Sequence, residues 1–102
     1  MATRALPNAD QAMVLSPQLA RLNNRSIAEV QAIVGNPDFR RVEPPGELWQ
    51  FRSQECVVDV FFYGAGDNRR VVRVEGRSRD PGRVAEQRCS DGSEVLKDRL
   101  RG

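Results

Sequence analysis

The chain has 102 residues, of which 39% are hydrophobic, and this is enough for one small domain with a single core. Positive and negative residues nearly balance at a formal net charge of +2, which gives no electrostatic reason to expect a nucleic-acid partner. No run approaches the roughly 20 consecutive apolar residues that a membrane-spanning helix needs.

The N-terminal part of the sequence divides into a leader and a short helix. Residues 1–15 mix small, polar and isolated apolar side chains without a sustained period, which predicts a flexible leader. A helix is then expected from Ser16 and Pro17, because serine caps helices well and proline tolerates the first helical position. Leu19 and Leu22 would share one face of this helix.

A second helix is indicated by signals at both of its ends. Ser26 and Glu29 have the spacing of a capping box, in which each side chain accepts a hydrogen bond from the other residue's backbone. Gly35 followed by Pro37 supplies the stop, since glycine suits the residue after a helix and proline cannot continue one.

Three segments rich in β-branched and aromatic residues predict an antiparallel meander. They span residues 47–53, 56–63 and 70–78, joined by a tight connection at Gln54-Glu55 and a glycine-containing loop at 64–69.

The segments on either side of this meander are less regular. Residues 39–42 are a candidate for a brief edge strand before the Pro44-Pro45-Gly46 turn, because paired prolines cannot donate to a sheet ladder. A helical segment is expected between residues 83 and 100, with an interruption at Asp91-Gly92.

These elements predict a single α+β domain over residues 16–102. Its two N-terminal helices and its C-terminal helical segment would pack on one face of a three-stranded antiparallel meander. With residues 53 and 56 opposite each other in the first hairpin, most large apolar side chains of the strands fall on that covered face. They are Trp49, Phe51, Cys56, Val58, Val60, Phe62, Val72 and Val74.

The other face of the sheet is predicted to be a contact surface for a partner. An apolar cluster rimmed by arginines is expected there, and such clusters are typical of protein interfaces. Its members are Leu48, Phe61, Tyr63 and Val71, with Arg52 and Arg73 at the rim. The alternatives are that the leader or a second copy covers these side chains, or that they are single exposed apolar residues without a role.

The two cysteines, Cys56 and Cys89, are both expected on the covered side of the sheet. In an oxidising compartment they would form a disulfide that ties the last helix to the sheet. The alternative is two buried thiols in a cytosolic protein. A zinc site is disfavoured, because two cysteines without any histidine do not supply a usual ligand set.

Catalytic chemistry has little support in this sequence. The chain contains no histidine, which removes the usual general base at neutral pH and the usual partner of a nucleophile. Asp59 and Glu75 would lie among arginines on the exposed face, which favours ion pairs over an acid and base pair. The arginine-rich last third lacks aromatic residues for base stacking. We therefore expect no catalytic residue, metal, cofactor or nucleic-acid partner.

The order of helix and strands resembles the SmpA/OmlA, or BamE-like, family of small outer-membrane lipoproteins, whose helical segment ends at Gly-x-Pro before a strand carrying Trp-x-aromatic. The matching positions here are Val30, Gly35, Pro37, Trp49, Phe51 and the apolar strand at 57–63. The resemblance covers about residues 16–76 and concerns packing and turn positions. The family does not generally require the cysteine pair, so this chain would be a divergent member.

The resemblance implies a non-enzymatic, periplasmic accessory protein that binds other envelope proteins or anionic lipid and supports outer-membrane assembly or integrity. It also implies a signal peptide and a lipid-bearing cysteine ahead of Met1, which would anchor the protein to the outer membrane. A homodimer through the exposed sheet face is a further candidate complex. The scaffold also resembles the repeat unit of β-lactamase-inhibitor proteins, so a secreted protein- or peptide-binding module is the alternative, and a cytosolic enzyme ranks third.

Overall fold

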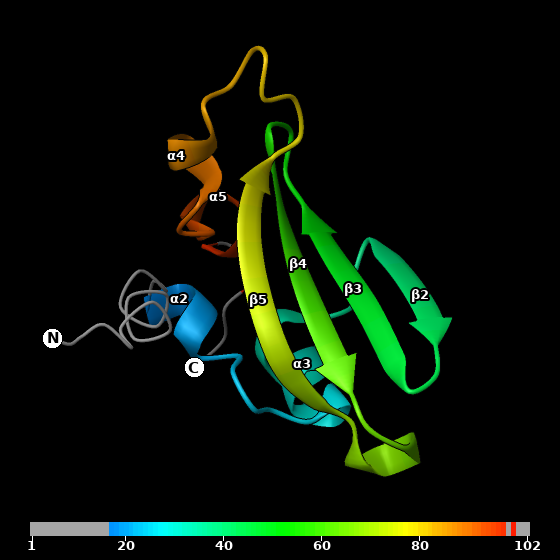
Figure 1. The fold of residues 1–102 in the computed structure, drawn as a ribbon. Coiled ribbons are helices and arrows are strands. Elements are labelled where there is room, and N and C mark those ends of the chain that lie inside the picture. Colours follow the sequence, from blue (N-terminus) through cyan, green and yellow to red (C-terminus); the bar gives the residue numbers. More distant parts are fainter. Residues whose placement is uncertain (1–16, 98, 100–102) are drawn as a thin grey trace, which may run out of the picture.

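The centre of the protein is a four-stranded antiparallel sheet whose strands follow one another in chain order (Figure 1). The structure is a computed structural model that describes residues 17–97 and 99. The strands are β2 (Phe39–Glu43), β3 (Gly46–Arg52), β4 (Cys56–Tyr63) and β5 (Arg70–Ser78). The α+β class and the antiparallel sheet are confirmed, whereas the expected number of three strands is wrong.

Four short helices lie on one side of this sheet. They are α2 (Pro17–Ala20), α3 (Ile27–Val34), α4 (Glu86–Cys89) and α5 (Ser93–Leu96), and a 3₁₀ turn, η1 (Gly66–Asn68), lies in the β4–β5 connection. The two expected N-terminal helices are matched only in part, because α2 is a single turn. The C-terminal segment is interrupted by Gly92, as expected, at a φ of 72°. The predicted leader, residues 1–15, lies outside the described residues.

The α3 helix forms where its end signals predicted it. The Ser26 side chain accepts a hydrogen bond from the Glu29 N–H at 3.1 Å, and the Glu29 carboxylate accepts one from the Ser26 N–H at 2.9 Å. This is the predicted capping box. The helix ends at Gly35, whose φ of 85° is a conformation that suits glycine. Val30 and Val34 are buried against the sheet.

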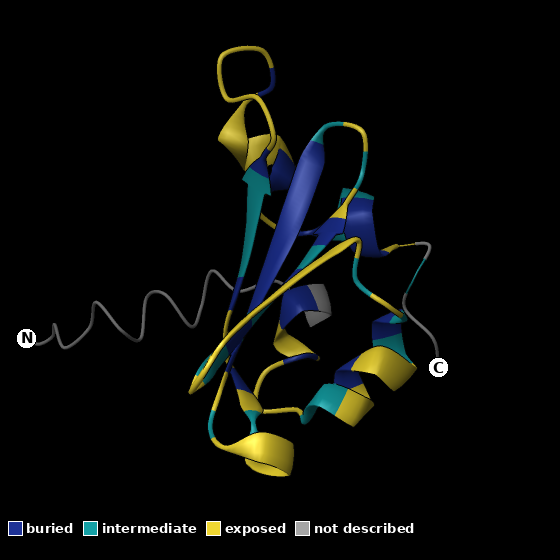
Figure 2. Cartoon of the chain, turned by 90° about the vertical axis from the view of Figure 1, so that its right-hand side faces the viewer, coloured by how far each residue is buried: buried dark blue, intermediate teal, exposed yellow. Residues whose placement is uncertain are grey.

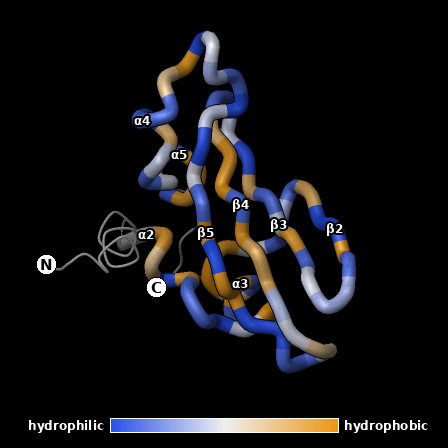
Figure 3. Tube along the Cα trace, viewed as in Figure 1, coloured by the Kyte–Doolittle hydropathy of each residue, from blue (hydrophilic) through white to orange (hydrophobic). Residues whose placement is uncertain are grey.

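The register between β3 and β4 places the large apolar side chains on the covered face. Ser53 N donates to the Cys56 carbonyl at 2.9 Å, which is the predicted pairing of the first hairpin. Trp49 and Phe51 are consequently buried with Val58, Val60 and Phe62 of β4. The strand β4 is buried along most of its length (Figure 2). β4 is also apolar along nearly its whole length, interrupted only by Asp59 (Figure 3).

A bulge between β4 and β5 changes the predicted faces of two valines. Phe61 pairs with Arg73, but the next residue, Phe62, pairs with Val71, so Val72 is the extra residue. One extra residue moves the side chains beyond it to the opposite face. Val71 is therefore 2% exposed in the core and Val72 is 60% exposed, and both predictions for these positions were wrong.

The fourth strand, β2, corresponds to the candidate edge strand at 39–42, extended by Glu43. It pairs along its whole length with β3, from Phe39 opposite Gln50 to Glu43 opposite Gly46. All five residues of β2 are exposed. Its place at the edge explains why three charged residues in five are compatible with a strand here.

Candidate functional site

The face of the sheet opposite the helices, here called the open face, carries alternate residues of all four strands. Neighbouring strands place these side chains in rows that run across the sheet. The row nearest the middle contains Arg41, Leu48, Phe61 and Arg73, and the row beyond it at one end of the sheet contains Glu43, Gly46 and Tyr63. Two further rows lie towards the opposite end. The first contains Phe39, Gln50, Asp59 and Glu75, and the second contains Arg52, Val57 and Arg77.

In the half of the open face around Asp59, polar side chains are hydrogen-bonded to one another. The Asp59 carboxylate accepts hydrogen bonds from Gln50 Nε2 and from Arg77 Nε, each at 2.7 Å. Arg52 Nη2 donates to Gln50 Oε1 at 2.8 Å. The hydrogen bond to Asp59 raises the pKa of the Arg77 guanidinium above its ordinary value. Asp59 is only 4% exposed, because these long side chains cover it, and each of its two carboxylate oxygens already accepts a hydrogen bond.

The other half, here called the apolar end, combines two half-buried apolar side chains, Leu48 and Phe61, with the exposed ring of Tyr63. Leu48 lies directly opposite Phe61, and the Arg73 guanidinium lies 5.4 Å from the centre of the Phe61 ring. Tyr63 in the next row is 60% exposed. The apolar end is therefore built from Leu48, Phe61, Tyr63 and Arg73.

A hollow of about 260 Å³ opens into the apolar end. Leu48 and Phe61 line it together with Arg41 and Glu43 of β2. Its floor includes Gly46, which has no side chain in the row between Glu43 and Tyr63. Because the sheet lacks one side chain at this point, a neighbouring molecule can place a side chain there.

The structure thus brings together four of the six predicted contact residues. The prediction that Val71 lies on this face is wrong, because the bulge buries its side chain in the core. Arg52 lies on the open face but at its far end, where its guanidinium stacks 5.5 Å from the ring centre of Phe39. Arg41 and Glu43 were not among the predicted contact residues, because the candidate edge strand at 39–42 was given no place in the predicted three-stranded meander. Residues 39–43 do not alternate between apolar and polar side chains, so their own sequence gives no signal that places them on this face.

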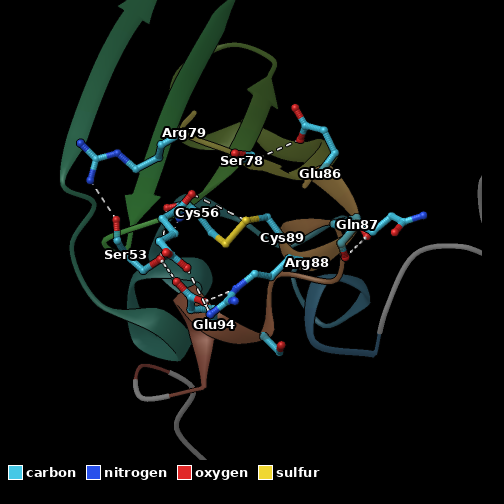
Figure 4. Close-up of a disulfide and its surroundings, with 12 residues drawn as sticks. Ser53, Cys56, Ser78, Arg79, Glu86, Gln87, Arg88, Cys89 and Glu94 are labelled. Carbon is cyan, nitrogen blue, oxygen red and sulfur yellow. Dashed lines mark hydrogen bonds and ion pairs between the residues drawn. A yellow bond between two sulfur atoms is a disulfide. The ribbon is translucent and has the colours of Figure 1, made fainter. Parts of the chain in front are cut away.

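The predicted disulfide between Cys56 and Cys89 is present (Figure 4). Both residues are at most 1% exposed, and the bridge joins the first residue of β4 to the last residue of α4. Since both cysteines of the chain are in this bridge, neither offers a thiol for catalysis.

Polar contacts beside the disulfide fasten α5 to the β3–β4 turn. Ser53 Oγ donates to Glu94 at 2.9 Å, and Arg88 lies 3.4 Å from the same carboxylate. The hydrogen bond from Ser53, followed by those from Arg88 and its positive charge, lowers the pKa of Glu94 below its ordinary value. These contacts hold the C-terminal segment in place and do not form a reactive group.

A buried carboxylate at Glu47 is the largest feature that the sequence analysis missed. Its side chain is fully buried on the covered face, where it accepts hydrogen bonds from Trp49 Nε1 at 2.7 Å and Arg40 Nε at 2.6 Å. Arg69 Nη1 donates to its other oxygen at 3.2 Å. The alternation that places Trp49 in the core also places Glu47 there, so the signal was present in the sequence.

The described residues contain neither a group of three or more metal-ligating side chains nor a helix long and apolar enough to cross a membrane. Comparisons with protein-family models, curated proteins and solved structures find no match. The function therefore has to be inferred from the two faces of the sheet and from the disulfide.

Proposed function

We propose that this chain is a non-enzymatic accessory protein of the bacterial envelope that binds another envelope protein, or an anionic lipid, through the apolar end of the open face. The observation that carries this proposal is the hollow beside Gly46, because it adjoins exposed aromatic surface that no described helix covers. A concave apolar site rimmed by arginines is suited to anchor a partner's side chain.

The distribution of polar contacts favours the apolar end over the rest of the open face. Asp59, Gln50 and Arg77 already satisfy one another, so a partner would gain little by contacting them. Arg41 and Arg73 also have acidic partners, Glu43 and Glu75, but these pairs are exposed and contribute little. Both arginines lie beside apolar surface, and arginine and tyrosine are typical of binding hot spots.

The disulfide supports the assignment to an oxidising compartment such as the periplasm. Structural disulfides are common in proteins outside the cytosol and rare within it. Together with the resemblance of residues 16–76 to SmpA/OmlA lipoproteins, this favours a role in outer-membrane assembly or integrity, with a lipid anchor ahead of Met1.

The double substitution Phe61→Glu with Tyr63→Glu tests this proposal. It places two carboxylates on the apolar end and should abolish capture of envelope proteins or of phosphatidylglycerol vesicles, while the circular dichroism spectrum stays unchanged. The matched control is Ala28→Glu with Ala32→Glu, which adds the same charge at exposed positions of α3. Equal binding by the wild type and the Phe61/Tyr63 variant would rule out the apolar end as the contact surface.

A further inference from the structure

A second hollow, lined almost wholly by polar side chains, lies between the α2–α3 turn and the start of β5. Its volume is about 460 Å³. Three arginines, two asparagines and one glutamate line it: Arg21, Arg25, Arg70, Asn23, Asn24 and Glu29. No residue of the apolar end contributes to it, so it is separate from the proposed partner surface.

Backbone hydrogen bonds hold two of these arginines next to each other. Asn24 N donates to the Val71 carbonyl at 3.0 Å, and Val71 N donates to the Arg25 carbonyl at 2.9 Å. Ser26 adds a β-bridge to Arg70. Arg25 and Arg70, which are far apart in the sequence, therefore project from one short ladder whose geometry does not depend on a ligand.

The positive charges of Arg25 and Arg70 share a single carboxylate, that of Glu29. Among the described residues Glu29 is the one acidic side chain in the lining, and it lies 3.7 Å from Arg25 and 3.6 Å from Arg70, beyond ordinary hydrogen-bond distance. The hydrogen bond from the Ser26 backbone lowers the pKa of Glu29, so its carboxylate is ionised and committed to the helix cap. The terminal nitrogens of both arginines keep donors that Glu29 does not satisfy.

The Arg25 side chain is also restrained before any ligand arrives. Its Nε donates to the Arg21 carbonyl at 3.1 Å, which fixes the direction of the guanidinium. A fixed guanidinium loses less conformational entropy when it binds an anion. The amides of Asn23 and Asn24 add neutral donors at the same hollow.

We propose that this hollow binds an oxyanion of the phosphate type, either free or as part of a larger molecule. Guanidinium forks and amide groups are suited to the several acceptor oxygens of a tetrahedral phosphate. Bound phosphate would also offset the repulsion between the neighbouring positive charges of Arg25 and Arg70.

The test is a titration of the isotope-labelled protein with sodium phosphate, followed by nuclear magnetic resonance, with sodium chloride at the same ionic strength as reference. We expect saturable shifts confined to residues around the hollow, including the side-chain amides of Asn23 and Asn24. Arg25→Gln and Arg70→Gln should each weaken binding by about tenfold, the effect of losing one charge-assisted contact. The control, Arg79→Gln with Arg83→Gln, removes two positive charges at exposed positions that line neither hollow, and it should bind phosphate as the wild type does.

Vesicles distinguish the two sources of the phosphate group. Binding to phosphatidylglycerol vesicles but not phosphatidylcholine vesicles, lost in the Arg25 and Arg70 variants, would identify a lipid headgroup. Binding of inorganic phosphate without vesicle binding would identify a free anion. The proposal is overturned if the wild type binds neither inorganic phosphate nor vesicles, or if the Arg79/Arg83 control weakens binding as much as Arg25→Gln and Arg70→Gln do. The wild-type shift map does not depend on any variant, so it decides the location even if a variant does not fold.

Discussion

The two faces of one strand, β4, use neighbouring residues in opposite ways. Val58, Val60 and Phe62 point into the core beneath the helices, whereas Phe61 and Tyr63 point to the open face. The covered face is closed by apolar packing and by the disulfide. On the open face, hydrogen-bonded polar side chains cover the half around Asp59, whereas Tyr63 is exposed in the other half. Packing on one side of the sheet therefore stabilises the fold, and residues on the other side are available to contact a partner.

Burial alone does not separate these two faces. Val57 and Asp59 belong to the open face, yet they are 3% and 4% exposed because long polar side chains cover them. The difference lies in what covers each face: helices pack on one face, and hydrogen-bonded polar side chains cover half of the other. The surface available to a partner is smaller than strand alternation predicts, and it is limited to the apolar end.

The largest expected difference between the faces is between two aromatic truncations. Trp49→Ala removes a ring that is 3% exposed and packs 5.1 Å from the Phe62 ring, centre to centre. We expect it to lower the free energy of unfolding by about 3 to 5 kcal/mol through the cavity it leaves. Tyr63→Ala on the open face should change it by no more than about 0.5 kcal/mol. Urea titrations followed by circular dichroism measure both.

Similar losses for the two variants would contradict the division of roles between the faces. A small loss for Trp49→Ala would mean that the core tolerates the cavity. A large loss for Tyr63→Ala would mean that Tyr63 packs against another part of the chain and is not available to a partner.

Much of the covered face could be predicted because local signals determine it. The capping box of Ser26 and Glu29 fixes the start of α3, and the tight turn after Arg52 fixes the register of β3 against β4. Pairing Cys56 with Cys89 followed from placing both on the covered side. The bulge at Val72 could not be predicted, because it depends on how β5 also bonds to the Asn24–Arg25 segment through Val71.

Less of the candidate site could be predicted, since it depends on an edge strand and on a missing side chain. β2 carries Arg40, Arg41 and Glu43, which resemble a loop in composition and become a strand only by pairing with β3. The hollow forms because Gly46 lies in a row of larger residues. Strand alternation predicts which face a residue lies on, but it does not predict which residues of neighbouring strands share a row.

The disulfide allows a second comparison of the two faces, because it links β4 to α4 on the covered face and does not involve the open face. The double variant Cys56→Ala with Cys89→Ala should lose about 3 to 4 kcal/mol of unfolding free energy, as the bridge closes a loop of 33 residues in sequence separation. Denaturation with and without reductant measures this loss, and the double variant itself should not respond to reductant. Binding through the apolar end should persist wherever the variant is folded. A loss below about 1 kcal/mol would show that packing of α4 and α5 alone holds the C-terminal segment.

The smallest of these effects concerns two glutamates on neighbouring strands, each paired with arginine. Glu47 is fully buried and accepts hydrogen bonds from Trp49, Arg40 and Arg69, whereas the side chain of Glu43 is 67% exposed and pairs with Arg41 alone. Glu47→Gln should cost about 2 kcal/mol, because it replaces an acceptor oxygen with a donor facing other donors.

Glu43→Gln should cost less than about 0.5 kcal/mol, because exposed ion pairs contribute little. The two variants remove the same charge and differ by the same atoms, so a urea titration of each isolates the effect of burial. Equal costs would mean that the buried carboxylate gains nothing from its three donors. In that case the bond from Arg69 to Glu47 would not help to hold the η1 connection against the sheet, and Arg69 would act only through its hydrogen bond to the Gly64 carbonyl within that connection.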